Sequence, residues 1–183
     1  PYIDSELWSG MTNANPVLVG QTAIGVAMSE DRKWVTIAAA QRTAEGRIHL
    51  EVGYHDAPTK AVVERLMRLI GAWDPCCLAF RGGKAPEMSL ATDLLAQGIE
   101  PETASSTVFA QACGGFYDDA VNGILSHSDD PRLATALASA RSKNDGGVPE
   151  AARGPAGYVP LIALSPDWEI VTTRVRASTI GSR

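Results

Sequence analysis

Apolar residues recur at helical spacing between residues 109 and 141, the most strongly patterned stretch of the chain. Positions separated by three, four and seven residues include Phe109, Ala112, Cys113, Phe116, Ala120 and Ile124. This spacing predicts a helix with one buried face. The polar corner HSDDP follows, in which Asp130 can cap a second helix and Pro131 suits its first position. We therefore expect two helices joined by this corner, with His127 as a residue at a helix end rather than a general base.

Three earlier runs have the composition of β-strands. They cover residues 23–28, 34–40 and 47–54, and the short polar segments SEDRK and RTAEG connect them. Connections of this length are typical of hairpins, so the runs predict a three-stranded antiparallel meander.

From residue 58 onward, helical and strand-like patterns alternate. A helix is predicted over 59–72, a buried strand over 76–80, a helix over 88–97 and a weak strand over 99–104. Strands that enter a sheet through helical crossovers pair in parallel. The sequence therefore predicts an α/β fold with a mixed sheet, in which three antiparallel strands precede parallel strands and helices flank the sheet. We expect an extended entry segment at 1–20 held to the body by Trp8, one domain at 21–165, and a strand-like C-terminal tail at 166–183.

Composition limits the classes of protein that need to be considered. The chain has 183 residues, of which 45% are apolar and 20% charged, values typical of a globular domain. Its net charge of −5 argues against a surface that is basic throughout, although a local patch can still neutralise phosphates. Two of the three cysteines are adjacent, which gives neither a disulfide framework nor zinc spacing and favours a reducing cytosol. No apolar run approaches the ~18 residues of a membrane span, so we expect no membrane partner.

The patterned segment also carries a family resemblance. Its sequence, FAQACGGFYDDAVNGILSHSDDPRLATALASAR, resembles the C-terminal nuclease domain of phage terminase large subunits, which has a similar series Q-A-C, F-Y-D-A-V, L-x-H, P-x-L and A-x-x-A-R. A weaker likeness covers IGVAMSEDRKWVTIAAA and CLAFRGGKAPE, so the resemblance extends over residues 20–165. It implies a ribonuclease H-like fold, a phage or prophage origin, and a domain that cuts DNA during packaging by a two-metal mechanism. The chain opens on Pro1 rather than Met, which is typical of a fragment or of a separated domain of a longer protein.

Two-metal hydrolysis needs several carboxylates that converge on a pair of divalent cations. The resemblance places the family's three acidic positions on Ala27 in GVAMSEDR, Phe80 in AFRGGKA and Gly147 in ARSKNDGG. None of these residues is acidic, and a phenylalanine at the centre of the site would exclude the ions. We therefore expect a catalytically inactive domain, a pseudoenzyme with a structural or DNA-binding role that requires no metal.

The alternative is an active endonuclease that uses Mg²⁺ or Mn²⁺ bound by displaced carboxylates. The residues that could supply them are Asp31 after the first strand, Glu87 after the glycine-rich turn, and Asp145 in the late loop. A second alternative is a protein-interaction module, such as an assembly part of a packaging motor.

Basic residues near the predicted site suggest a surface for double-stranded DNA. Arg81 and Lys84 follow the fourth strand, and Arg141, Lys143 and Arg153 surround the late loop. Ordinary surface charge is the competing interpretation. The partners that we expect are thus double-stranded DNA and other subunits or domains of a packaging motor, in the cytoplasm of the host cell.

Overall fold

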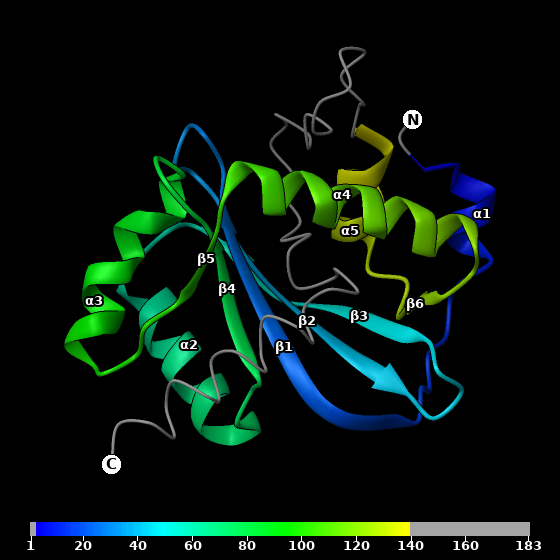
Figure 1. The fold of residues 1–183 in the computed structure, drawn as a ribbon, viewed down its shortest axis with the longest axis horizontal. Coiled ribbons are helices and arrows are strands. Elements are labelled where there is room, and N and C mark those ends of the chain that lie inside the picture. The colour runs from blue at the N-terminus through cyan, green and yellow to red at the C-terminus, as the bar shows by residue number, and fades with distance from the viewer. Residues whose placement is uncertain (1–2, 140–183) are drawn as a thin grey trace.

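The strands form one six-stranded mixed sheet in a computed structural model that describes residues 3–139 (Figure 1). The strands are β1 (Leu18–Met28), β2 (Val35–Thr43), β3 (Ile48–Asp56), β4 (Cys77–Arg81), β5 (Glu102–Ala104) and β6 (Leu125–His127). Their order in the sheet is β5-β4-β1-β2-β3-β6. The first three strands are antiparallel, whereas β4, β5 and β6 each join a neighbour in parallel. The predicted α/β fold with a mixed sheet is therefore confirmed.

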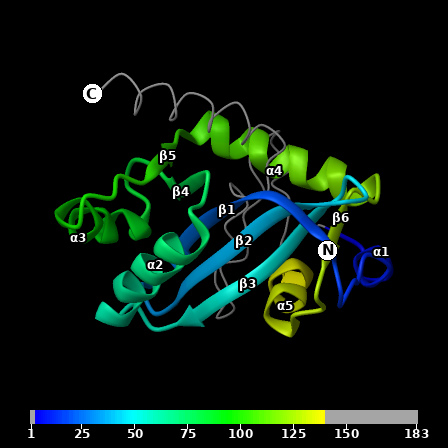
Figure 2. The same ribbon diagram turned by 90° about the horizontal axis from the view of Figure 1, so that it is seen from below.

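Helices cover both faces of this sheet. They are α1 (Ser5–Ser9), α2 (Lys60–Trp73), the 3₁₀ helix η1 (Pro86–Leu90), α3 (Ala91–Ala96), α4 (Ser106–Val121) and α5 (Pro131–Ser139). Figure 2 shows α2 and α4 on opposite sides of the sheet. No helix within residues 3–139 is long and apolar enough to cross a membrane.

Each face of the sheet has its own hydrophobic core. On the α2 face, Val26 of β1 and Phe80 of β4 pack with Leu66 of α2. On the α4 face, Leu50 of β3 packs with Phe116 of α4 and with side chains of α5. Burial of a side chain of this size stabilises a fold by about 1.5–3 kcal/mol. These two cores hold the sheet between its helices and fix which face each strand residue presents.

The segment 109–141 differs from its predicted form at its centre. Helix α4 ends at Val121, and Gly123, with φ of +67°, turns the chain out of the helix. Ile124 is consequently 37% exposed instead of facing the core. A short strand, β6, then pairs with β3 before α5 begins, so the two helices are joined by a strand as well as by the polar corner. The start of α5 is as predicted, with Asp130 Oδ1 accepting from the Arg132 amide at 2.8 Å.

The entry segment contains regular structure of its own. Asp4 caps the short helix α1 by accepting from the amides of Glu6 and Leu7, and β1 already begins at Leu18, so residues 1–20 are not extended throughout. Trp8 holds this segment to the body as predicted, since it is 5% exposed. The predicted tail at 166–183 and the end of the predicted domain at 140–165 lie outside the described residues.

A buried imidazole is the partner of Trp8. The indole stacks on the His127 ring with centroids 4.1 Å apart, and His127 Nε2 lies 2.8 Å from the Trp8 carbonyl oxygen. The amide of Asp129 donates to His127 Nδ1 at 3.0 Å, so the ring accepts at one nitrogen and donates at the other. Only the neutral tautomer can do both, and burial correspondingly lowers the pKa of His127. His127 thus lies on β6 as a structural residue and not at a helix end.

Candidate active site at the carboxyl ends of β1 and β4

The predicted site lies where two adjacent parallel strands end. β1 and β4 pair in register, with Val26 opposite Phe80. Because strand side chains alternate, the following residues, Ala27 and Arg81, share the other face of the sheet. The Arg81 guanidinium lies 5.9 Å from the centroid of the Phe109 ring of α4, which places it on the α4 face. Ala27 and Arg81 are therefore the pair of residues at the site.

Phe80 does not lie at the centre of the site, contrary to the expectation drawn from the resemblance. Its side chain is fully buried on the α2 face, against Val62 and Leu66. A one-residue shift along a strand moves a side chain to the opposite face, so the next residue, Arg81, is the one that shares the face of Ala27. The β4 residue beside Ala27 is a cation, Arg81, instead of a carboxylate or an aromatic ring.

A buried ion pair occupies this position. Arg81 Nε lies 2.6 Å from Glu87 Oε1, and an Nη atom lies 2.8 Å from Oε2, so the guanidinium and the carboxylate meet side on. The Arg81 side chain is 14% exposed and that of Glu87 is fully buried. Arg81 also donates to the Met28 carbonyl at 3.1 Å and lies 3.8 Å from a Glu30 carboxylate oxygen.

The carboxylate of Glu87 accepts from backbone groups as well. The amide of Met28 donates to Oε2 and that of Arg81 donates to Oε1, both at 3.3 Å. Glu87 thus joins the ends of β1 and β4 to η1, and its oxygens already accept four hydrogen bonds. A divalent cation would have to displace the guanidinium in order to bind Glu87.

A glycine turn brings Glu87 back toward Arg81. The Gly82 amide donates to the Ala104 carbonyl of β5 at 2.8 Å, and a Cβ at Gly82 would lie 2.9 Å from that oxygen. The next residue, Gly83, has φ of +65°. The turn therefore needs glycine at both positions, one for close approach and one for its backbone conformation.

Asp31, another proposed substitute ligand, organises the turn between β1 and β2. Its Oδ1 accepts from the Ser29 hydroxyl at 2.6 Å and from the Lys33 amide at 3.1 Å, and its other oxygen lies 3.7 Å from Lys33 Nζ. The hydrogen bond from Ser29, followed by that from Lys33, lowers the pKa of Asp31. This pattern is typical of an Asp that stabilises a turn.

Ala27 and Arg81 begin a row of residues that runs across the sheet, and the neighbouring strands β2 and β3 each add one residue to it. Thr36 of β2 pairs with Ala27, and His55 of β3 pairs with Thr36. The Thr36 hydroxyl lies 2.8 Å from His55 Nδ1, and the Trp34 indole stacks on the His55 ring with centroids 5.1 Å apart. Burial, with a contribution from the nearby Arg132 charge, lowers the pKa of His55. Our sequence interpretation missed this cluster, because Trp34 and His55 are distant along the chain and only strand register brings them together.

The described residues do not fit a centre of two divalent cations. Across the four strands the row reads Arg81, Ala27, Thr36 and His55, which supplies a cation, a methyl group, a hydroxyl and an imidazole. Within residues 3–139, no group of three or more His, Cys, Asp or Glu could hold a metal ion. Hard cations need several converging oxygens, which this row lacks. The other predicted positions, Arg141, Lys143, Asp145, Gly147 and Arg153, lie outside the described residues.

The two buried cysteines, Cys77 and Cys113, do not offer a nucleophile. Cys77 is buried on β4, and burial together with the nearby Glu102 charge raises the pKa of its thiol. Burial likewise raises the pKa of Cys113 on α4 to about 12. Both thiols are therefore protonated at neutral pH and behave as small apolar side chains.

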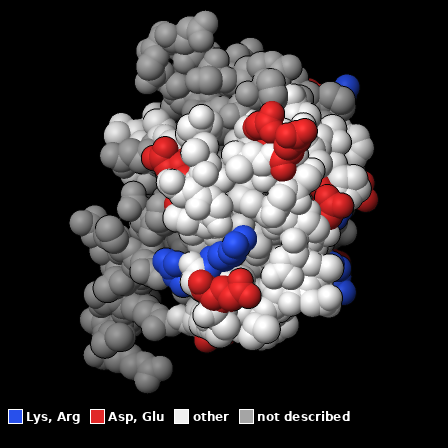
Figure 3. Space-filling model, turned by 90° about the vertical axis from the view of Figure 1, so that its right-hand side faces the viewer, with Lys and Arg blue, Asp and Glu red and all other residues white. Residues whose placement is uncertain are grey.

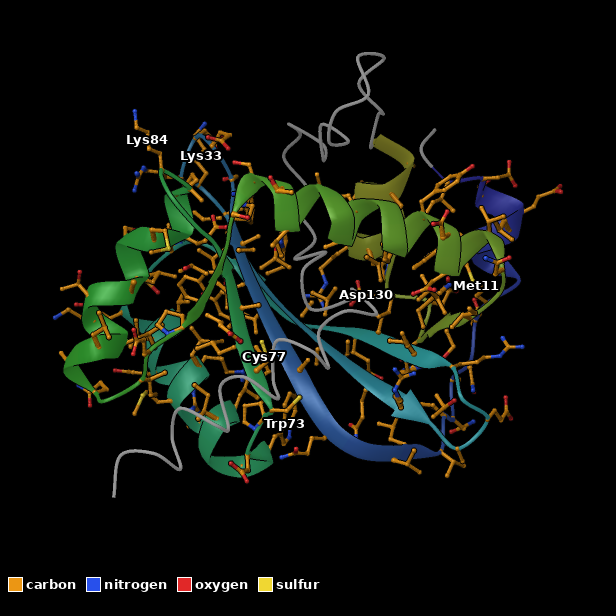
Figure 4. The ribbon with its side chains drawn as sticks, viewed as in Figure 1. Met11, Lys33, Trp73, Cys77, Lys84 and Asp130 are labelled. Atoms are coloured by element: carbon orange, nitrogen blue, oxygen red, sulfur yellow. The ribbon has the colours of Figure 1, made fainter. Side chains whose placement is uncertain are left out.

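Positive charge at the site edge comes from exposed lysines rather than from Arg81. Figure 4 shows Lys33 and Lys84 at the same end of the sheet, where the turns after β1 and β4 lie. Lys84 is exposed, whereas the Arg81 charge is balanced by Glu87. On the side of the molecule drawn in Figure 3, the described acidic and basic side chains form small separate groups instead of one continuous basic surface.

Solved structures share this fold. The HK97 bacteriophage large terminase superposes with a TM-score of 0.68 at 14% identity, over 90% of this chain and 42% of that one. The large terminase nuclease of thermophilic phage G20c with bound magnesium gives 0.59 at 16% identity, over 87% and 95%. The nuclease domain of the Thermus phage P74-26 large terminase gives 0.55 at 17% identity, over 86% and 90%. No protein-family model and no curated protein sequence matches the chain.

The chain thus has a ribonuclease H-like fold. Within that class its fold is the one found in the nuclease domains of phage large terminases, as the sequence resemblance implies. It spans less than half of the HK97 large terminase and nearly the full length of the isolated nuclease domains.

Proposed function

We propose that this chain is a terminase nuclease-like domain of phage or prophage origin, which acts in DNA packaging without hydrolysing DNA by a two-metal mechanism. The observation that carries the proposal is the Arg81–Glu87 pair beside Ala27. A guanidinium with a saturated carboxylate partner lies next to Phe80 and Ala27, the two described positions at which the resemblance implies acidic ligands. Two cations about 4 Å apart could use the Glu87 carboxylate only by displacing the Arg81 guanidinium from it.

Plasmid DNA with Mn²⁺ or Mg²⁺ tests the absence of hydrolysis. We expect supercoiled plasmid to stay intact over times in which an active ribonuclease H-like nuclease linearises it. Cleavage that requires the metal and disappears in Asp145→Asn or Asp31→Asn would overturn the proposal and establish the active endonuclease instead. Arg68→Gln, on the solvent side of α2, is the matched control that should leave either outcome unchanged.

We further propose that the site edge contacts the backbone of double-stranded DNA. Exposed Lys84 at the end of β4 supports this role, together with Arg141, Lys143 and Arg153 in the sequence that follows α5. Arg81 contributes to this surface through the ion pair that shapes the turn, because its own charge is compensated.

Salt dependence distinguishes this DNA contact from a protein-only role. Binding of a labelled duplex should weaken with salt, and Lys84→Gln should reduce the slope of log Kd against log salt by about one. Arg68→Gln, at an exposed position in the second half of α2, should leave the slope unchanged. Binding that does not depend on salt concentration, or that both substitutions weaken equally, would exclude a DNA-binding surface at this edge.

A further inference from the structure

A concave feature lies on the α2 face of the sheet, away from the candidate active site. It is a cavity of about 550 Å³ between the C-terminal end of α2 and strands β1 to β3. This volume falls within the range of sites that bind small molecules. Small residues on the sheet, Ala39 and Gly53, leave the space open.

Apolar side chains form one wall of the cavity. Trp73 at the end of α2 and Leu18 at the start of β1 are 45% and 43% exposed, and Leu69 lies one turn before Trp73 on α2. Figure 4 shows Trp73 at the end of α2 that lies beside β1. An indole that is this exposed beside a cavity offers a flat face on which a planar group can stack.

The charged lining is acidic. Glu51 of β3 and Asp74, which follows α2, line the cavity, and the described lining contains no Lys or Arg. Helix α2 has no basic residue in its last turn, so the negative end of its dipole adds to these two charges. Arg65 of α2, which is not part of the lining, donates to the Gly53 carbonyl at 3.3 Å.

Glu51 is held in position by its neighbours. Its Oε1 accepts from the Ser128 hydroxyl at 2.7 Å and lies 3.1 Å from His49 Nε2. The carboxylate side chain remains 56% exposed, and its contacts within residues 3–139 are made through Oε1. The second oxygen is therefore oriented in advance for an incoming donor.

We propose that this cavity receives an arginine side chain presented by a protein partner. A guanidinium can stack on Trp73 and donate to the carboxylates of Glu51 and Asp74, while its aliphatic stem lies along Leu69. Phosphate groups of nucleic acid are disfavoured at the same place, because they would meet two carboxylates and the C-terminal end of a helix. The distribution of charge thus favours a protein contact at this cavity and a DNA contact at the site edge.

Arginine and citrulline derivatives test this assignment on the intact chain. N-acetyl-arginine methylamide should shift the amide and indole resonances of Trp73 and its neighbours in ¹⁵N-labelled protein, at millimolar concentration and matched ionic strength. N-acetyl-citrulline methylamide has the same shape without the charge, and it should bind at least about tenfold more weakly. Equal binding of the two compounds, or shifts located elsewhere, would overturn the proposal.

Variants at the rim assign the binding energy to particular groups. Asp74→Asn retains the left-handed backbone, which Asn tolerates, and should weaken arginine binding about threefold. Glu51→Gln should weaken it similarly, and Trp73→Leu should remove it. Glu100→Gln, an exposed residue outside the lining, is the control. If rim variants and control bind arginine equally, the cavity is not its site. The outcome is independent of DNA cleavage, so failure here leaves the proposed function standing.

Discussion

The Arg81–Glu87 pair makes a quantitative prediction about folding stability. Arg81→Met leaves the fully buried Glu87 carboxylate without its charge partner, and Glu87→Met leaves a guanidinium that is 14% exposed. Removal of one member of a buried pair costs about 3–5 kcal/mol, because the remaining charge stays desolvated. For a domain of this size each 1 kcal/mol lowers Tm by roughly 2–4 °C. Each single variant should therefore melt roughly 6–20 °C below the parent protein.

The double variant separates pairing from burial. Replacing both residues by methionine removes both charges and leaves the amides of Met28 and residue 81 without their acceptor, which costs about 1–3 kcal/mol. The double variant should thus lose less stability than the sum of the singles, by at least about 2 kcal/mol. Urea unfolding followed by circular dichroism measures the stability of the parent protein, the two single variants and the double variant.

An exposed pair of the same geometry provides the control. Arg132 contacts Asp130 at 2.6 Å, but its side chain is 44% exposed. Arg132→Met should cost no more than about 1 kcal/mol, as surface pairs do. If the Arg81 and Glu87 singles cost as little as this control and their effects add, the pair is not a buried structural element and our reasoning about the site fails.

Three further predictions concern the histidines, the N-terminal segment and the cap of α5. The folded state lowers the pKa values of His127 and His55, so the unfolded chain takes up protons first, and the free energy of unfolding should fall as pH drops below about 6.5. Urea midpoints between about pH 7.5 and 5.5 measure this fall. His127→Gln should make the free energy of unfolding less dependent on pH. Trp8→Ala should cost about 3–5 kcal/mol through loss of a buried indole, whereas Trp73→Ala, at an exposed indole, should cost far less. Asp130→Ala should cost about 1 kcal/mol through loss of the cap of α5, and Asp130→Asn should retain most of that stability.

Each of these predictions has a result that contradicts it. Stability that is level or rises from neutral pH to about 5.5 would show that the histidines are not held neutral by the fold. If Trp8→Ala and Trp73→Ala lose equal stability, the stack of Trp8 on His127 does not hold the N-terminal segment to the body. An Asp130→Asn variant as unstable as Asp130→Ala would assign the effect to the ion pair with Arg132 instead of the cap.

The fold was predictable from sequence because its signals are periodic. Strands β1 to β3 alternate between buried and exposed positions or run as apolar segments, and α2 carries a clear apolar stripe, so pattern alone indicates their type and order. The strand β6 has only three residues, which is too short to show a period. Its pairing with β3 depends on tertiary contacts, which the local sequence pattern does not show. His127 was therefore predicted at a helix end, whereas it lies buried on β6.

The sequence predicts a location for the site but not which side chains share a face of the sheet there. Motif comparison placed it at the ends of β1 and β4, but the choice between Phe80 and Arg81 depends on a register of one residue, which sequence does not encode locally. The Arg81–Glu87 contact depends on the turn at Gly82 and Gly83, which folds the chain back.

The most direct test of the account is a crystal structure of the protein soaked in Mn²⁺, with anomalous scattering used to locate the ions. We predict no anomalous peak beside Ala27 and an intact Arg81–Glu87 pair. Two peaks about 4 Å apart at the ends of β1 and β4, bound by Glu87, Asp31 or Asp145, would contradict the account and identify a working two-metal nuclease.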